Sequence, residues 1–278
     1  MSPALPPLLL RSLQATGALL WLYGFLRLFE WKSLYFPRVT IEATPAQLGL
    51  TFEEITLVAE DGVQLNGWWL PQPHARGAII HCHGNAGNLG HRVELAAELH
   101  RLGLNVFLFD YRGYGQSRGW PTERGLYRDA RAAYEFVRAQ YGHVERPPIL
   151  LHGQSLGGAV AAQLARDKPV VGIIIESAFT SVPNMVRQLY PGLPLYRLIS
   201  ARYNTLASLE QLVIPKLIAH STEDAIIPFA MGCQFFAAAA PPKRFIVLTG
   251  GHNDSAWTDN YRQAVREFVD ETLSSATK

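Results

Sequence analysis

The pentapeptide Gly-Gln-Ser-Leu-Gly at residues 153–157 constrains this chain more than any other segment. The apolar residues 149–151 before it predict a buried strand, and the Ala- and Leu-rich residues 158–166 after it predict a helix. A serine at such a strand-to-helix junction must adopt a strained backbone, and flanking glycines remove side chains that would clash. Glycines also flank serines in ordinary loops, but this context favours a nucleophile elbow that exposes the hydroxyl of Ser155.

A serine nucleophile of this kind needs a histidine base and an acid that orients the histidine. Asp224 follows the apolar residues 215–219, and His252 follows the apolar residues 244–248. Both side chains are therefore expected in loops at the carboxyl ends of strands, where sites form in open α/β sheets. The sequence thus predicts a triad of Ser155, Asp224 and His252, in that chain order. Taken singly, the acid fits a solvated turn and the histidine a cap, but their occurrence together favours catalysis.

A tetrahedral intermediate also needs hydrogen-bond donors for its oxyanion. The backbone N–H of Leu156, directly after the serine, is expected to supply one of them. The small-residue loop His-Gly-Asn-Ala-Gly-Asn at 83–88 follows the predicted strand 77–82, and its backbone can approach a ligand closely. We assign the second donor to the N–H of Asn85, with the N–H of Ala86 as the alternative.

These motifs together resemble those of the α/β-hydrolase superfamily. The resemblance rests on the loop just described, on Phe-Asp-Tyr-Arg-Gly-Tyr-Gly-Gln-Ser-Arg-Gly at 109–119, on the elbow within 152–158 and on Gly-Gly-His-Asn-Asp at 250–254. The chain is similar in particular to a membrane-anchored subgroup that includes protein depalmitoylases and uncharacterised bacterial proteins. The resemblance covers residues 35–272 and implies an eight-stranded, mostly parallel sheet flanked by helices. It also implies the triad given above and substrates that are acyl esters or thioesters.

Two other carboxylates compete with Asp224 for the role of the acid. Glu223 is its neighbour, and Glu176 ends an earlier predicted strand. The spacing between Asp224 and the Ile-Ile-Pro at 226–228 resembles the acid loop of this superfamily, and it therefore favours Asp224. Glu176 is kept as an alternative acid.

Composition excludes several classes of partner and cofactor. The chain has 278 residues, of which 48% are hydrophobic and 17% charged, and this suits one large folded α/β domain. A net charge of +2 without a basic cluster argues against a nucleic-acid partner. Cys82 lies in a predicted core strand, so a buried thiol is expected rather than a disulfide with Cys233. His81 and His83 share a strand face but lack partners other than His91, so no metal site is expected, and the chemistry needs no cofactor.

Residues 1–34 predict an apolar helix that precedes a hydrolase domain at 35–278. Arg11 is the only charged residue between residues 5 and 26, and a membrane-spanning helix needs about 20 apolar residues. An arginine near one end of a span can extend its charge toward the interface. We therefore expect a single N-terminal membrane anchor, with a helix docked on the body or buried in a dimer as the alternative.

The charges around this helix suggest its orientation in a membrane. Arg11 lies on one side of the apolar run, while Arg27, Lys32 and Arg38 lie on the other. Basic residues favour the cytoplasmic side, so there is a slight bias toward a cytoplasmic catalytic domain. A cleaved signal peptide is disfavoured, because no clear small-residue cleavage site follows the apolar run.

The body of the chain alternates between strand and helix patterns, and such alternation specifies a parallel sheet. An antiparallel hairpin, 52–58 and 63–70, comes first, with Asp-Gly at 61–62 as its turn. The expected elements that follow are strands 77–82, 105–110, 149–151, 170–175, 215–219 and 244–248, and helices 91–102, 122–141, 158–166 and 257–273. Asp110, Arg112 and Ser117 form a polar turn with an expected structural role.

Residues 177–209 interrupt this alternation. The segment contains three prolines and many apolar residues, and it predicts a short lid-like insertion that forms an acyl-binding wall; ordinary packing of a short helix fits equally well. Phe179 and Trp257 are expected to line the substrate pocket, because each follows a predicted catalytic loop or strand end.

The sequence therefore predicts a serine hydrolase that cleaves acyl esters or thioesters through an acyl-enzyme intermediate. Its expected substrate is a small acyl ester or a lipid-like molecule. Two alternatives stay open, namely a peptidase-like amidase and a non-catalytic membrane scaffold with a hydrolase fold. The complete triad argues against the scaffold, because a scaffold does not need three matched residues.

Overall fold

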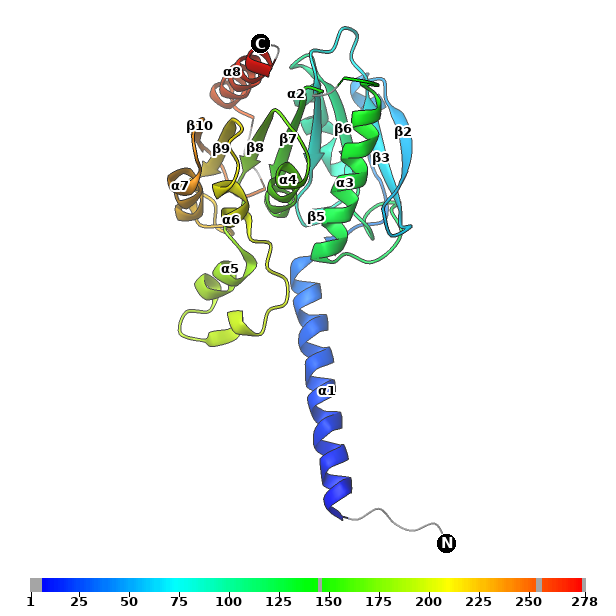
Figure 1. Cartoon of the computed structure of the whole chain (residues 1–278), viewed down its shortest axis with the longest axis vertical. Coiled ribbons are helices and arrows are strands. Elements are labelled where there is room, and N and C mark those ends of the chain that lie inside the picture. The colour runs from blue at the N-terminus through cyan, green and yellow to red at the C-terminus, as the bar shows by residue number, and fades with distance from the viewer. Residues whose placement is uncertain (1–6, 145–146, 254–256, 277–278) are drawn as a thin grey trace.

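An eight-stranded sheet forms the centre of the computed structural model, which describes residues 7–144, 147–253 and 257–276 (Figure 1). Its strands are β2 (Glu53–Val58), β3 (Gln64–Leu70), β4 (Ala78–Cys82), β6 (Asn105–Phe109), β7 (Ile149–Gln154), β8 (Gly172–Glu176), β9 (Lys216–Ser221) and β10 (Lys243–Leu248). They lie in the order β10-β9-β8-β7-β4-β6-β3-β2. Five neighbouring pairs are parallel, and β3 runs antiparallel to both β6 and β2.

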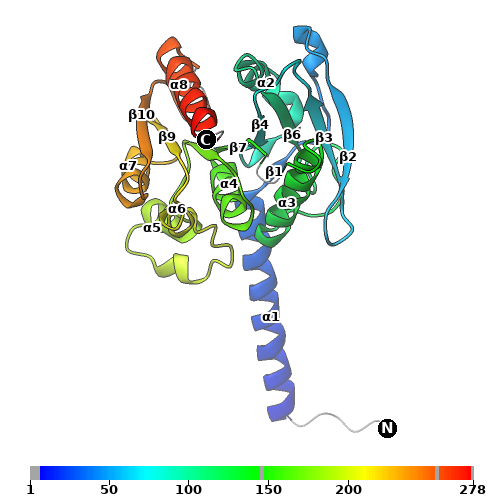
Figure 2. The ribbon, with the colours of Figure 1, turned by 45° about the horizontal axis from the view of Figure 1, so that its top comes forward.

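Helices cover both faces of this sheet, as Figure 2 shows. They are α2 (Val93–His100), α3 (Glu123–Ala139), α4 (Leu156–Asp167), α5 (Val182–Leu189), α6 (Thr205–Glu210), α7 (Phe229–Ala238) and α8 (Asp259–Ala276). One hydrophobic core packs α3, α4, α6 and α7 against one face, and a second packs α2 and α8 against the other. Successive strand residues alternate between the cores, with Ile79 in one and Ile80 in the other. Burial on both faces explains why the central strands are mostly apolar rather than alternating.

The expected elements are present with small shifts at their ends, but several short elements were missed. The two-residue strands β1 (Phe36–Pro37) and β5 (Ala86–Gly87) pair with each other, and α7 lies between β9 and β10. The described residues also form three 3₁₀-helices, η1 (Pro45–Leu48), η2 (Leu89–Arg92) and η3 (Pro194–Arg197). A two-residue strand has no periodicity to detect, and α7 begins without a side-chain cap.

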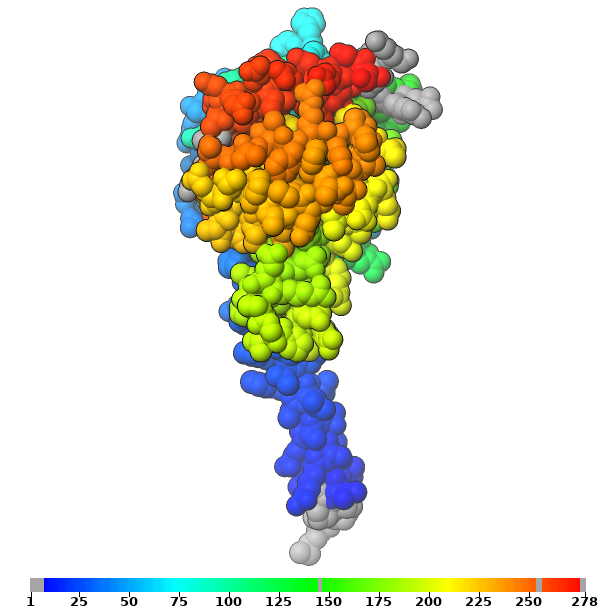
Figure 3. Space-filling model, turned by 90° about the vertical axis from the view of Figure 1, so that its left-hand side faces the viewer, coloured from blue at the N-terminus to red at the C-terminus, as the bar shows by residue number. Residues whose placement is uncertain are grey.

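The N-terminal helix α1 (Pro7–Leu34) forms as expected, but its assignment as a membrane anchor is wrong. Figures 1 and 3 show it extending well beyond the body, and many of its apolar side chains are exposed. None of the helices in the described ranges is long and apolar enough to cross a membrane. Arg11, Gln14 and other polar residues interrupt the apolar run and lower its mean hydropathy. The localisation and the membrane contact inferred from an anchor are therefore withdrawn.

The last turns of α1 are bound to the segment that joins η3 to α6. Glu30 is buried, with 6% of its side chain exposed, and its carboxylate accepts hydrogen bonds from the N–H groups of Ser200 at 2.9 Å and Ala201 at 2.7 Å. Arg27 forms an ion pair with the same carboxylate at 2.6 Å. The hydroxyl of Tyr35 lies 2.7 Å from that of Tyr203. Except for the ion pair within α1, these contacts join parts of the chain that are about 170 residues apart.

A buried ion-pair cluster ties the β2–β3 turn to α3. The guanidinium of Arg112 contacts Asp61 at 2.9 Å and Asp129 at 2.7 Å, and the side chain of Asp129 is fully buried. Arg112 thus has a structural role, as expected for its turn. Because the carboxylate of Asp129 has lost its water, it depends on the guanidinium for compensation.

Replacing Arg112 with leucine should destabilise the protein strongly, because the buried carboxyl of Asp129 would lose the partner that compensates for its burial. We expect the free energy of unfolding to fall by about 3–5 kcal/mol in urea denaturation. Arg76→Leu is the control, since Arg76 pairs with Asp270 at 2.6 Å but both side chains are nearly half exposed. Its loss should stay below about 1 kcal/mol. Equal losses in the two variants would contradict the role given to Arg112.

Candidate active site

The backbone at Ser155 has the strained conformation expected of an elbow. Ser155 lies between β7 and α4 with φ of 53° and ψ of −120°. Its N–H donates to the carbonyl of Glu176 at 2.9 Å, and its carbonyl accepts from Gly158 at 3.0 Å. A Cβ atom at Gly157 would lie only 1.9 Å from the carbonyl oxygen of Cys82. The sharp turn is therefore possible only because glycine lets α4 begin directly against β4.

The structure brings the three predicted triad residues together from three different loops. The Nε2 atom of His252 lies 3.1 Å from the Oγ atom of Ser155, and its Nδ1 atom lies 2.7 Å from the Oδ2 atom of Asp224. Ser155 and Asp224 are each only 8% exposed. Both distances are within hydrogen-bond range, so the histidine can accept a proton from the serine while the carboxylate orients its ring.

The acid is held as a carboxylate by several donors. The backbone N–H groups of Ile226 and Ile227 donate to its Oδ1 atom at 2.9 and 2.8 Å. Burial alone would raise the pKa of Asp224, but hydrogen bonds from His220, His252 and Ile227 outweigh it and hold the pKa below its usual range. The contact of His220 with the acid was not predicted from the sequence. His220 is the second-to-last residue of the buried strand β9 and belongs to no recognisable motif.

The two competing acids have other environments. Glu176 accepts hydrogen bonds from the hydroxyl of Tyr261 at 3.0 Å and from the side chain of Gln154 at 3.3 Å. Its Oε2 atom also lies 3.3 Å from the Nε2 atom of His152. Glu223 is exposed, and its N–H donates to the hydroxyl of Ser221. Of the three carboxylates, Asp224 is the one for which a contact with the Nδ1 atom of His252 is observed.

The loop after β4 passes directly beside the serine. A Cβ atom at Gly84 would lie 3.5 Å from that of Ser155. The side-chain amide of Asn85 donates to the carbonyl of Leu34 at 3.0 Å. The backbone carbonyl of Asn85 accepts from the N–H of Phe36 and from the hydroxyl of Tyr114. These bonds fix the side chain of Asn85 and the peptide that follows it in the chain.

The two predicted oxyanion donors are compatible with this geometry. In the described ranges, no hydrogen bond occupies the backbone N–H of Asn85 or of Leu156, the first residue of α4. A helix N-terminus leaves its first amides without partners and favours negative charge nearby. The supporting residues of α1 and β1 were missed from the sequence, since nothing local links them to the loop 50 positions later.

The residues expected in the pocket have different surroundings. Phe179 is 7% exposed and packs edge-on against Tyr203, with ring centroids 6.4 Å apart. Trp257 is partly exposed, packs on Tyr261 at 5.0 Å and lines a polar cavity of about 420 Å³ together with Gln154 and Asn253. Gln154 and Asn253 are the chain neighbours of Ser155 and His252, but none of the three predicted triad residues itself lines this cavity.

The two histidines considered as metal ligands bond to protein atoms. The Nδ1 atom of His81 lies 2.8 Å from that of His152, and the Nδ1 atom of His83 lies 2.7 Å from the carbonyl of Gly84. Within the described ranges, no group of three or more metal-ligating side chains is clustered. Cys82 is a buried free thiol, and Cys233 is an exposed one.

Comparison with known proteins identifies the family. Residues 73–200 match a family model described as a serine aminopeptidase, S33. An α/β-hydrolase domain-containing protein of Arabidopsis thaliana is 32% identical over 255 residues, covering 82% of each chain. The chain belongs to the α/β-hydrolase superfamily, and this family assignment indicates that it is a hydrolase.

Two further matches cover most of the molecule. An uncharacterised protein of Mycobacterium tuberculosis is 37% identical over 276 residues, covering 97% of this chain and 96% of its own. The crystal structure of an esterase from Pyrococcus furiosus superposes with a TM-score of 0.72 at 20% identity, covering 86% of this chain and 100% of the esterase. At that identity the second match supports the fold alone.

A second buried acid–histidine pair lies behind the oxyanion loop. The Oδ1 atom of Asp110 accepts from the N–H of Leu89 at 3.0 Å and lies 3.6 Å from the Nε2 atom of His83. Burial raises the pKa of Asp110 to about 8, and burial lowers the pKa of His83 to about 3. Both groups are therefore held neutral in the folded protein near neutral pH.

Asp110→Asn should stabilise the protein increasingly as pH rises. In the parent, the pKa of Asp110 is about 8 when folded and about 3.8 when unfolded, so its stabilising contribution is complete below pH 4 and is lost as pH rises toward 8. Asparagine does not titrate, so the variant escapes this loss. Thermal unfolding at pH 5 and pH 8 tests this, and a Tm difference that is equal at both values would contradict it.

Proposed function

We propose that this protein is a serine hydrolase that cleaves acyl esters or thioesters through an acyl-enzyme intermediate. The observation that carries the proposal is the continuous series of hydrogen bonds from Ser155 through His252 to Asp224. A surface cluster would not need a strained serine backbone, a fully satisfied carboxylate and a histidine that bridges them.

The proposed first half of the reaction acylates the serine. His252 Nε2 takes the proton of Ser155 as the Oγ atom attacks the acyl carbonyl carbon. Asp224 fixes the histidine tautomer and stabilises the imidazolium that forms. The backbone N–H groups of Asn85 and Leu156 donate to the oxygen on which negative charge develops. Acylation is complete when the tetrahedral intermediate collapses, because the C–O or C–S bond breaks and His252 gives its proton to the departing alcohol or thiol.

In the proposed second half, water releases the acid. His252 then accepts a proton from water, whose oxygen attacks the acyl carbon. The Ser155–acyl bond breaks, and the proton returns from His252 to the serine oxygen. The cycle uses only groups of the chain, the substrate and water.

We further propose that residues 35–278 form the hydrolase domain after an N-terminal segment 1–34, with 177–209 as a lid-like insertion. The insertion follows β8, beside the strand that carries the nucleophile. Several of its apolar side chains are exposed, namely Leu189, Tyr190, Leu193, Leu195 and Leu198. Such side chains suit a wall that contacts an acyl group. Phe179 and Trp257 are proposed to line the pocket beneath this wall.

Amide hydrolysis is the second candidate, because the matching family model is described as a serine aminopeptidase. An amide reaction differs in its leaving group, which His252 must protonate before it departs. Parallel assays on acyl nitrophenyl esters, acyl thioesters and aminoacyl nitroanilides with the same enzyme preparation distinguish the two. Preference for the anilides by kcat/KM would replace the ester proposal.

Ser155→Ala should abolish covalent labelling and turnover while leaving the fold intact. A fluorophosphonate probe should modify the parent at Ser155 alone, as located by mass spectrometry of the labelled peptide. Loss of the nucleophile should reduce kcat by about 10⁶-fold. Undiminished hydrolysis by the variant, or labelling at another serine, would overturn the assignment.

Asp224→Asn should reduce kcat by about 10⁴-fold, because an amide favours the wrong histidine tautomer. Glu223→Gln is the matched control, since this neighbouring acid is exposed and makes no contact with the histidine in the described structure. It should keep a kcat close to that of the parent. Steady-state kinetics on one ester decides, and the reverse order of effects would assign the acid to Glu223.

A further inference from the structure

A cavity larger than the one lined by Trp257 lies where α1 joins the body. Its volume is about 780 Å³, within the range of about 300–1,000 Å³ typical of small-molecule sites. It is bounded by residues 27–35 of α1 and its end, by residues 120–127 at the start of α3, and by Ser200 and Ala201. No residue of the triad or the oxyanion loop lines it, so this space is not the reaction site.

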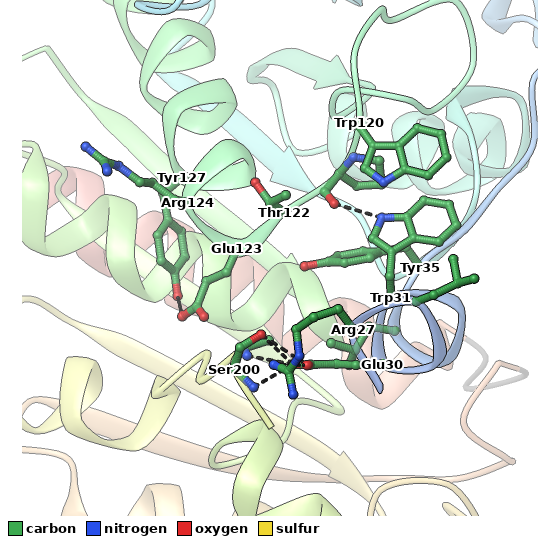
Figure 4. Close-up of a pocket in the computed structure, with 14 residues that line it drawn as sticks. Arg27, Glu30, Trp31, Tyr35, Trp120, Thr122, Glu123, Arg124, Tyr127 and Ser200 are labelled. Atoms are coloured by element: carbon green, nitrogen blue, oxygen red, sulfur yellow. Dashed lines mark hydrogen bonds and ion pairs between the residues drawn. The ribbon is translucent and has the colours of Figure 1, made fainter. Parts of the chain in front are cut away.

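The walls of this junction cavity are mostly aromatic and aliphatic. Trp31 stacks on Trp120 with ring centroids 4.4 Å apart, and its indole N–H donates to the carbonyl of Pro121 at 2.9 Å. Figure 4 shows Trp31 and Tyr35 facing Tyr127 across the opening. The stacking and the hydrogen bond hold the Trp31 ring in place, so the surface is formed before any ligand arrives.

Acidic groups at the cavity are already occupied by the protein. Glu30 accepts from two backbone N–H groups and pairs with Arg27. Glu123 accepts from the N–H groups of Arg202 at 2.6 Å and Tyr203 at 2.7 Å, and from the hydroxyl of Tyr127 at 2.9 Å. A cationic ligand would therefore have to displace existing bonds, at the cost of leaving buried donors unpaired.

The basic groups do not favour an anion either. One guanidinium nitrogen of Arg27 pairs with Glu30, and another donates to the carbonyl of Leu198. Arg124 is exposed, and Figure 4 shows its guanidinium turned away from the space between the rings. Apart from the Nε–H of Arg27, which is buried without a hydrogen-bond partner among the described residues, the charged groups of the walls are paired within the protein or directed to solvent. The surface that faces the cavity therefore complements a neutral molecule.

We propose that the junction cavity is a binding site for a neutral, largely apolar molecule, such as a long-chain alcohol. Its rings and aliphatic side chains supply the apolar contact, and its balanced charges select against ionised ligands. The site is distinct from the triad and does not depend on the proposed hydrolytic reaction. A ligand there contacts α1, α3 and the segment at 200–201 at once.

The test uses a long-chain alcohol with a photoreactive diazirine at its far end, applied to the full chain below its micelle concentration. After irradiation, labelled peptides are identified by mass spectrometry. Labels should appear in residues 120–127 as well as 28–35, because both segments line the cavity. The unlabelled alcohol should compete, whereas the matching fatty acid anion should compete at least about tenfold less well.

Two variants that fill the cavity test the same site. Leu28→Trp and Ala201→Phe enlarge side chains that line it, and each should reduce labelling of residues 120–127 at least about tenfold. Leu19→Trp is the matched control, since Leu19 lies on the same helix, is 67% exposed and lies outside the cavity. Its labelling of 120–127 should equal that of the parent.

Ser155→Ala separates this site from the proposed hydrolytic site. Labelling of 120–127 should be unchanged in that variant, so loss of hydrolytic activity and loss of binding are read independently. Labelling confined to residues 8–26 of α1 would show non-specific adsorption on its exposed face and overturn the proposal. Absence of labelling in the parent would also overturn the proposal. This outcome does not depend on whether the cavity-filling variants fold.

Discussion

The close approach of α4 to β4 is the constraint on which the site depends. Gly157 lies so near the carbonyl of Cys82 that any side chain there would collide with the backbone. This contact sets the position of Ser155 at the edge of the sheet, with its hydroxyl toward the histidine loop. The sheet is buried on both faces, so the strands that carry the loops cannot shift independently. A strained serine is kept in place by packing that is stabilised elsewhere in the molecule.

Charge is distributed unevenly between the carboxylates of Asp224 and Asp110, each of which lies beside a histidine. Asp224 receives two backbone amides and two imidazoles, which compensate for its burial and keep it ionised. Asp110 receives one backbone amide and is more deeply buried, so burial dominates and the neutral form is favoured. The two carboxylates thus differ both in their burial and in the number of their donors. Asp224 is linked to Ser155 through His252.

Much of the fold was readable from the sequence because its signals are local. Central strands such as β4 and β7 begin with apolar runs, and the polar residues at and after their ends mark the loops of the candidate site. The bonds of Glu30 to Ser200 and Ala201 were not readable, because they join distant segments without a motif. The pairing of β1 with β5 is too short for periodicity. The prediction of a membrane anchor was wrong for another reason. The polar residues among the apolar ones of α1 make the helix less apolar than a membrane span requires.

The hydrogen bonds around Asn85 connect the end of α1 to the candidate oxyanion loop. The side chain of Asn85 donates to the carbonyl of Leu34, the last residue of the helix, and the backbone carbonyl of Asn85 accepts from the N–H of Phe36. The end of α1 is therefore part of the scaffolding of the candidate oxyanion loop, although its first turns extend away from the body. A shortened chain that begins after Phe36 would keep all three triad residues and still lack the supports of this loop. A fragment that keeps these hydrogen bonds to Asn85 therefore has to begin inside the helix, upstream of the domain boundary at residue 35 that the sequence pattern suggests.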